Sequence, residues 1–66
     1  MTAYYVNNDA QSNGDHEVHI RDCTYFPSNN RYLGDHASCG PAVTAAKAIY
    51  WQSNGCYWCC RACHTS

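Results

Sequence analysis

The sequence predicts a small α+β domain: a β-hairpin or three-stranded sheet with one helix and a C-terminal zinc knuckle. Three observations indicate this fold. Short β-prone runs fill the first 36 residues, an alanine-rich helical stretch follows Pro41, and four of the six cysteines lie between positions 56 and 63. Because 66 residues are enough for only one domain, we expect residues 1–66 to form a single zinc-stabilised unit.

Three runs of β-prone residues are expected to form the strands. Residues 3–6 make the first, and turn-forming residues join it to a second at 16–21. The second run alternates between two faces, one of which carries Glu17, His19 and Arg21. Residues 31–36 make a weaker third strand that is interrupted by Gly34.

The helix is predicted over residues 41–50. Pro41 suits its first position, with Ser38, Cys39 or Gly40 as the cap. An apolar stripe at helical spacing is formed by Ala42, Ala45, Ala46 and Ile49. The pair Asn54-Gly55 is expected to end the helix, with Gly55 in the left-handed conformation.

The sequence has too few large aliphatic residues to stabilise a folded chain without a cross-link. The sequence has one leucine, two isoleucines and three valines, while ordering the chain costs roughly 100 kcal/mol. A structural zinc ion would add about 10–16 kcal/mol. The first residues lack the basic and apolar regions of a signal peptide, and no stretch reaches membrane-spanning length. These features predict a cytoplasmic protein whose thiols bind metal in preference to forming disulfides.

The C-terminal stretch contains two abutting C-x-x-C pairs, which are followed directly by His64. Thiolates at this spacing suit zinc, which takes four Cys or His ligands in a tetrahedron. Upstream, the spacing His19-x-x-x-Cys23 lets a strand and its turn direct an imidazole and a thiolate at one point. We predict a site of three cysteines and one histidine, completed by one of the pairs Cys56/Cys59 and Cys60/Cys63. His64 is an alternative ligand, whereas His16 lies on the opposite face of its strand from His19.

Several short runs carry a resemblance to a known zinc module. They are residues 5–7, 19–27, 30–33 and 57–63, with Ala42 and Ala46 between them. In these runs the chain resembles the Ada-like metal-binding domain, the zinc module of the Ada DNA-repair methyltransferase that is also appended to nuclease-like proteins. The resemblance implies that the zinc ligands are His19, Cys23, Cys60 and Cys63.

The chain departs from that family in its closing knuckle, G-Y-x-P-C-x-x-C. Cys56 stands where the knuckle has glycine and Cys59 where it has proline, so Cys56 and Cys59 remain alternative ligands. The methyl-accepting chemistry of the family needs four cysteines, and a histidine ligand makes that activity unexpected here. Cys39 is left as a buried thiol, an occasional disulfide partner or a ligand of a second zinc.

The expected function is that of an interaction module with a structural zinc, not an enzyme. A fully ligated zinc has no open position for a catalytic water, and no catalytic triad, acid/base carboxylate pair or phosphate-binding loop is evident. Many aromatic residues beside arginines favour a protein partner or self-association. A net charge of −1 with scattered cations makes a nucleic-acid-binding accessory module the weaker alternative. A thiol-redox or metal-handling protein is the other alternative, and neither a membrane nor a small-molecule substrate is indicated.

Overall fold

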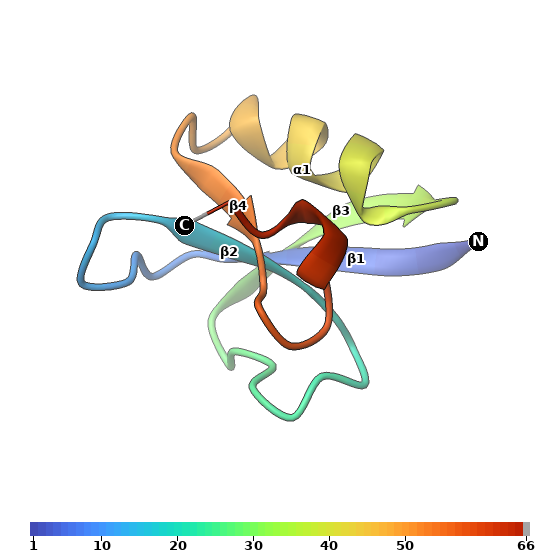
Figure 1. Cartoon of the computed structure of the whole chain (residues 1–66), viewed down its shortest axis with the longest axis horizontal. Helices are drawn as coiled ribbons and strands as arrows, with labels where there is room; N and C mark the ends of the chain where they lie inside the picture. The colour runs from blue at the N-terminus through green and yellow to red at the C-terminus, as the bar shows by residue number, and fades with distance from the viewer. Residues whose placement is uncertain (66) are drawn as a thin grey trace.

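A four-stranded sheet with one helix across its face makes up residues 1–65, the part of the chain that the computed structural model describes (Figure 1). The elements in chain order are β1 (Thr2–Asn7), β2 (His16–Ile20), β3 (Asn30–His36), α1 (Cys39–Lys47), β4 (Ser53–Gly55) and the short 3₁₀ helix η1 (Arg61–Cys63). The strand order is β3-β1-β2-β4. The predicted α+β class and the three predicted strands are therefore confirmed, and β4 is an addition.

The central strand β1 pairs antiparallel with both β2 and β3. On one side Tyr5 lies opposite His19. On the other side the register shifts between Tyr4 and Tyr5, which face Gly34 and Tyr32 of β3 respectively. Gly34 has a φ of 97°, a left-handed conformation that glycine adopts readily, so it belongs to this irregularity in the sheet.

The helix is shorter at its C-terminal end than the sequence predicted. α1 ends at Lys47, where the N–H groups of Ala48 and Tyr50 bond to carbonyls of the last turn. The chain then returns to the sheet as β4, which runs parallel to β2 and pairs Gly55 with Val18. Gly55 is therefore a strand residue, and the prediction that it caps the helix in a left-handed conformation is wrong. This pairing brings the segment that follows β4 beside β2.

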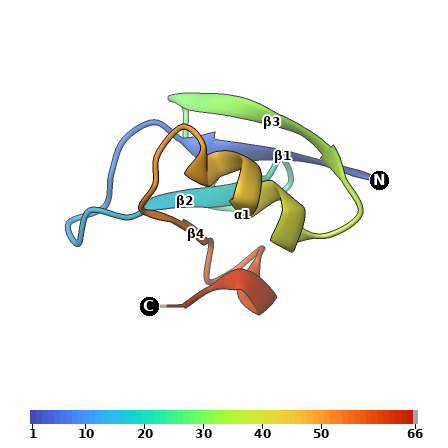
Figure 2. The same cartoon turned by 90° about the horizontal axis from the view of Figure 1, so that it is seen from above.

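The core lies between α1 and one face of the sheet (Figure 2). Its buried members are Tyr4, Val6, Val18, Ala42, Ala46 and Cys60. The two alanines have no exposed surface, and their small side chains let the helix backbone approach the strands closely. None of the helices in residues 1–65 has the length and apolar character needed to cross a bilayer.

Gly55 lies where the returning chain leaves no room for a side chain. A Cβ atom there would be 2.6 Å from the carbonyl oxygen of Cys60 and 2.8 Å from the Cβ of Cys63. We expect Gly55→Ala to lower the free energy of unfolding by about 1–3 kcal/mol, because the backbone around η1 would have to shift. Urea denaturation followed by circular dichroism would measure the change.

The matched control is Gly40→Ala in the first turn of α1, where the nearest atom to the new Cβ is Ser38 Oγ at 4.0 Å. Alanine is the better helix former, so this variant should be as stable as the parent or more stable by about 0.5–1 kcal/mol. If both variants unfold at the same urea concentration, the close approach at Gly55 does not affect the free energy of unfolding.

Candidate metal centre

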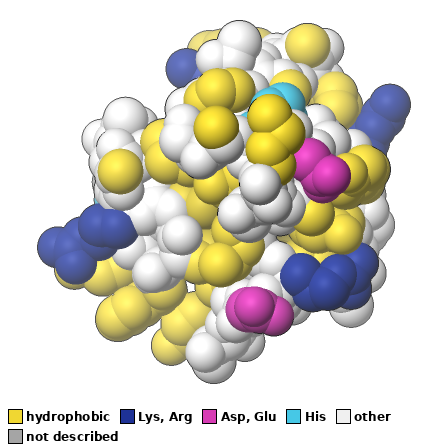
Figure 3. All heavy atoms as spheres, turned by 90° about the vertical axis from the view of Figure 1, so that its right-hand side faces the viewer, with side chains coloured by type: hydrophobic (Ala, Val, Ile, Leu, Met, Phe, Trp, Pro, Cys, Tyr) yellow, Lys and Arg dark blue, Asp and Glu magenta, His cyan; other side chains and the backbone are white. Residues whose placement is uncertain are grey.

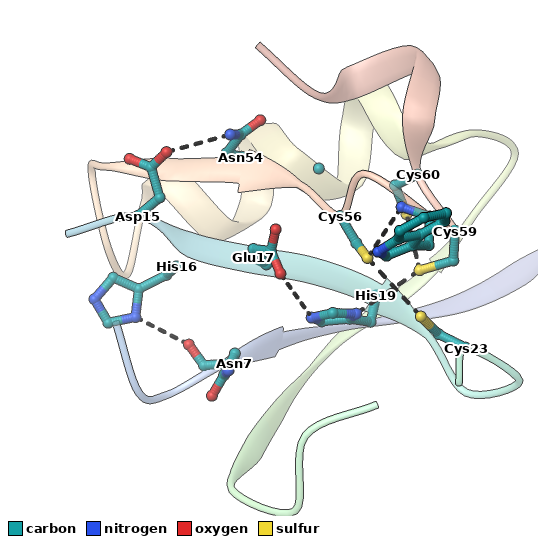
Figure 4. Close-up of polar contacts among 12 residues, drawn as sticks. Asn7, Asp15, His16, Glu17, His19, Cys23, Asn54, Cys56, Cys59 and Cys60 are labelled. Atoms are coloured by element: carbon teal, nitrogen blue, oxygen red, sulfur yellow. Dashed lines mark hydrogen bonds and ion pairs between the residues drawn. The ribbon is translucent and has the colours of Figure 1, made fainter. Parts of the chain in front are cut away.

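Four side chains converge beside the sheet face that α1 does not cover (Figure 4). They are His19 of β2, Cys23 of the following loop, and Cys56 and Cys59 of the segment after β4. One nitrogen or sulfur atom from each residue lies within 4.8 Å of the corresponding atoms of the other three. His19 and Cys56 are buried, whereas Cys23 and Cys59 are half-buried. The cluster thus joins residues that are far apart in the sequence.

The distances in the cluster match a tetrahedral metal site. Zinc binds sulfur at about 2.3 Å and imidazole nitrogen at about 2.0–2.1 Å, so tetrahedral ligands lie about 3.8 Å apart for two sulfurs and about 3.6 Å for sulfur and nitrogen. The sulfurs of Cys23 and Cys56 are 3.9 Å apart. The Sγ atom of Cys59 is 3.8 Å from Nδ1 of His19. Both separations therefore fit the spacing of ligand atoms in a tetrahedral zinc site.

Backbone hydrogen bonds hold the C-x-x-C turn in place. The N–H of Cys56 donates to the carbonyl of Val18 at 2.9 Å, which continues the β4 pairing up to the first ligand. The N–H of Cys60 donates to the carbonyl of Cys56, also at 2.9 Å, and closes the turn. The N–H of Trp58 points at the sulfur of Cys56, 3.4 Å away, and partly offsets the burial that raises the pKa of that thiol. Such amide contacts favour a thiolate, the form that binds metal.

Without a metal, burial disfavours the charged forms of three members of the cluster. Loss of hydration raises the pKa of Cys56 and of Cys59. The same effect lowers the pKa of His19, against the smaller opposing influence of Glu17. Burial thus disfavours the thiolates of Cys56 and Cys59, and a divalent cation would supply the charge that lets them ionise.

Glu17 lies on the far side of the His19 ring from the sulfurs. Its Oε1 atom is 3.7 Å from Nε2 of His19, while Nδ1 faces Cys59 (Figure 4). The two residues share a strand face because they are two positions apart, as the alternation of this strand predicted. A carboxylate in this place orients a ligating imidazole and raises its basicity.

The structure brings together only part of the ligand set that the family resemblance implied. His19 and Cys23 are in the cluster, but the distal pair is Cys56/Cys59, the alternative pair. Cys60 points into the core, with its sulfur 4.0 Å from that of Cys59. Cys63 forms a disulfide with Cys39 at the start of α1, so its sulfur is not free to bind metal. The chain turns into η1 after Cys60, which directs Cys60 and Cys63 away from the ligand pair.

The remaining histidines bond to backbone carbonyls outside the cluster. His64, an alternative ligand in the sequence analysis, places Nδ1 3.0 Å from the carbonyl oxygen of Gly55. Nδ1 of His16 lies 2.9 Å from the carbonyl oxygen of Asn7, and the His16 ring stacks on Tyr50. Nε2 of His36 lies 2.9 Å from the carbonyl oxygen of Leu33. Within residues 1–65 a second zinc site is not formed, because Cys39 is in the disulfide.

The shifted pKa values predict how pH affects the metal-free protein. Because the pKa of His19 lies below 6.5, the folded state binds fewer protons than the unfolded chain in acid, so stability falls as pH drops below 6.5. The pKa values of Cys56, Cys59 and Cys60 lie above 9.0, so the folded state keeps protons that the unfolded chain loses, and stability falls again above pH 9.0.

Thermal melts in chelator between roughly pH 5 and pH 10 should therefore show the highest Tm between these limits. A His19→Gln variant should lose most of the fall on the acid side and keep the fall on the alkaline side. An unchanged acid limb in that variant would mean that another group controls the low-pH transition.

The geometry of this cluster is the main guide to the function of the protein. No family model, no curated protein and no solved structure matches this chain.

Proposed function

We propose that this protein is a zinc-stabilised interaction module in which the metal has a structural role. The observation that supports the proposal is the convergence of His19 with three cysteine sulfurs within 4.8 Å of one another, with two of the separations at 3.8 and 3.9 Å. Thiolate and imidazole ligands together favour zinc over the oxygen-preferring ions magnesium and calcium. Four protein ligands would leave zinc without an open position, which supports a structural role over a catalytic one.

The metal would connect the two halves of the chain. Cys23 and Cys56 are 33 positions apart, and the cluster holds the loop after β2 against the segment after β4. The disulfide Cys39–Cys63 fixes the same C-terminal segment to α1. A chain with so small a core gains its largest single stabilisation from cross-links of this kind.

Aromatic side chains next to the cluster form the candidate contact surface, which we call the knuckle patch: Tyr25, Tyr57, Trp58 and Arg61. Trp58 is 66% exposed and Tyr25 58% exposed, and their rings lie 5.7 Å apart. The guanidinium of Arg61 stacks over the ring of Tyr57 at 4.3 Å. Trp, Tyr and Arg are the residues most enriched in binding hot spots, which supports a protein partner or self-association.

The charge distribution favours a protein partner over a nucleic acid. Figure 3 shows a face with extensive hydrophobic surface on which the Lys and Arg side chains stand apart from one another. A nucleic-acid-binding surface usually carries a continuous basic stripe. The nucleic-acid alternative predicts binding of single-stranded DNA at low salt, and undetectable binding there would remove it.

The burial of Cys56 and Cys60 counts against a catalytic thiol-redox enzyme. Reactive catalytic cysteines are exposed and have lowered pKa values, whereas burial raises the pKa of Cys56 and of Cys60. The resemblance to the Ada-like domain and the cytoplasmic location stay predictions. The Cys39–Cys63 disulfide weighs against the cytoplasm, because such bonds are most frequent in oxidising compartments.

Native mass spectrometry of the protein with its disulfide intact tests the proposal. We expect one zinc ion per chain, and cobalt substitution should give the strong thiolate charge-transfer absorption of a tetrahedral site. The four cysteines outside the disulfide should react slowly with a thiol reagent until a chelator is added. Absence of bound zinc, with all four thiols reacting at the rate of an unfolded chain, would overturn the proposal.

A further inference from the structure

Two of the free thiols come from distant parts of the chain and are nearly in contact. Cys23 and Cys56 are both outside the disulfide, and their sulfur atoms are 3.9 Å apart. A disulfide bond is about 2.05 Å long, so the two sulfurs need to come about 2 Å closer for an oxidant to join them. Cys23 is half-buried and accessible to a small oxidant, while Cys56 is buried directly beside it. Figure 4 shows the two side chains pointing toward each other from their separate segments.

The other close pair is less suited to bond formation. The sulfurs of Cys59 and Cys60 are 4.0 Å apart, but these residues are neighbours in the sequence. A disulfide between them would close a small ring that contains their peptide bond and would strain its planar geometry. Cys60 is also buried in the core, which shields it from an oxidant. The geometry therefore favours the pair that joins two segments.

We propose that Cys23 and Cys56 are a disulfide-forming site for hydroperoxides, and that their bond replaces the metal as the link between the loop after β2 and the C-terminal segment. The proposal rests on the same cluster as the proposed function, but it concerns the two sulfurs alone. Oxidation removes two of the four ligands, so the metal is released. The two segments stay joined in both states.

The chemistry needs only a two-electron oxidant such as hydrogen peroxide. The sulfur of Cys23 attacks one peroxide oxygen, the O–O bond breaks, and the other oxygen leaves as water, which forms a sulfenic acid on Cys23. The sulfur of Cys56 then attacks the sulfur of Cys23, the S–O bond breaks, and a second water leaves. In sum, two thiols and one hydrogen peroxide give one disulfide and two waters.

Tryptic peptides distinguish the possible products. Cleavage after Arg21, Arg31, Lys47 and Arg61 places Cys23 in peptide 22–31 and Cys39 in 32–47. Cys63 falls in peptide 62–66, and Cys56, Cys59 and Cys60 share peptide 48–61. The zinc-loaded protein and the chelated protein are each treated with one equivalent of hydrogen peroxide, and the remaining thiols are then blocked and the chain digested.

We expect an intact-mass loss of about 2 Da and a new linked species, peptide 22–31 joined to 48–61. The existing link between 32–47 and 62–66 should persist and serves as the internal standard. In the zinc-loaded sample, release of zinc to a colorimetric chelator should follow the same time course. A product confined to peptide 48–61, or a link between 22–31 and 62–66, would overturn the proposal.

Fragmentation of the linked peptides assigns the bond within 48–61 without any variant. Assignment to Cys59 or Cys60 overturns the proposal, and assignment to Cys56 supports it. The matched variants are Cys56→Ser, which should abolish the link, and Cys60→Ser, which should keep it. Zinc binding without the link would overturn only this inference. If the link forms in a protein that does not bind zinc, the proposed function and the exchange with metal are overturned, while the disulfide-forming site itself stands.

Discussion

Chelation of the metal is expected to lower the Tm sharply, and chelation combined with reduction of the disulfide is expected to leave the chain unfolded. A structural zinc contributes about 10–16 kcal/mol in small peptides, while small domains have net stabilities of about 5–15 kcal/mol. Residues 1–65 bury only six core side chains, so little remains once both cross-links are lost. Circular dichroism melts with zinc, with chelator, and with chelator plus reductant would measure the three states.

Zinc added back to the chelated and reduced protein provides the control for this experiment. The far-ultraviolet spectrum and the cooperative transition should return with one equivalent of metal, because the ligand set forms from the folded register of β2 and β4. If chelated and zinc-loaded proteins melt at the same temperature, the cluster is not a structural metal site.

Replacement of Cys59 is expected to weaken zinc binding by at least about 100-fold, whereas replacement of Cys60 should change it little. Even the loss of a residue that only orients a ligand costs about 10–100-fold in affinity, and Cys59 is placed to bind the metal itself. Cys60 is the neighbouring residue, with a sulfur 4.0 Å from that of Cys59, but it points into the core. Competition against a chelator of known affinity would measure both constants.

The alanine variants Cys59→Ala and Cys60→Ala make a closely matched pair. Cys60→Ala should lower stability, because it leaves a small cavity between the sheet and α1, while zinc stoichiometry stays at one per chain. The opposite pattern, with zinc lost from Cys60→Ala and kept by Cys59→Ala, would favour the pair implied by the Ada-like resemblance.

Alternation along the second strand was the most informative feature of the sequence. It predicted that Glu17 and His19 share a face, and the structure places Glu17 beside the His19 ring at the edge of the cluster. This prediction succeeds because side-chain direction along a strand depends only on the twofold period of the backbone. The single helix was predictable for a similar reason, since Pro41 and the alanines carry local propensity.

The choice between the two C-x-x-C pairs could not be made from spacing. It depends on β4, whose residues Ser53, Asn54 and Gly55 have low strand propensity and form a strand because β2 offers them hydrogen-bonding partners. That pairing brings Cys56 to the ligand position. The Cys39–Cys63 disulfide could not be predicted from the sequence either. Its partners lie 24 positions apart, and six cysteines allow many connectivities.

The C-terminal segment that β4 places beside β2 is tightly packed, whereas the loop between β1 and β2 is exposed. This contrast determines where the chain can be altered. Residues 9–13 lie in the exposed loop between β1 and β2, which contains no cysteine, and should accept an inserted tag or peptide. Within residues 53–63, the buried strand, the two candidate metal ligands, the disulfide half and the glycine without free space should tolerate few substitutions, whereas exposed positions such as Trp58 should tolerate more. A mutational scan would show this contrast as a permissive N-terminal loop and a restrictive C-terminal segment.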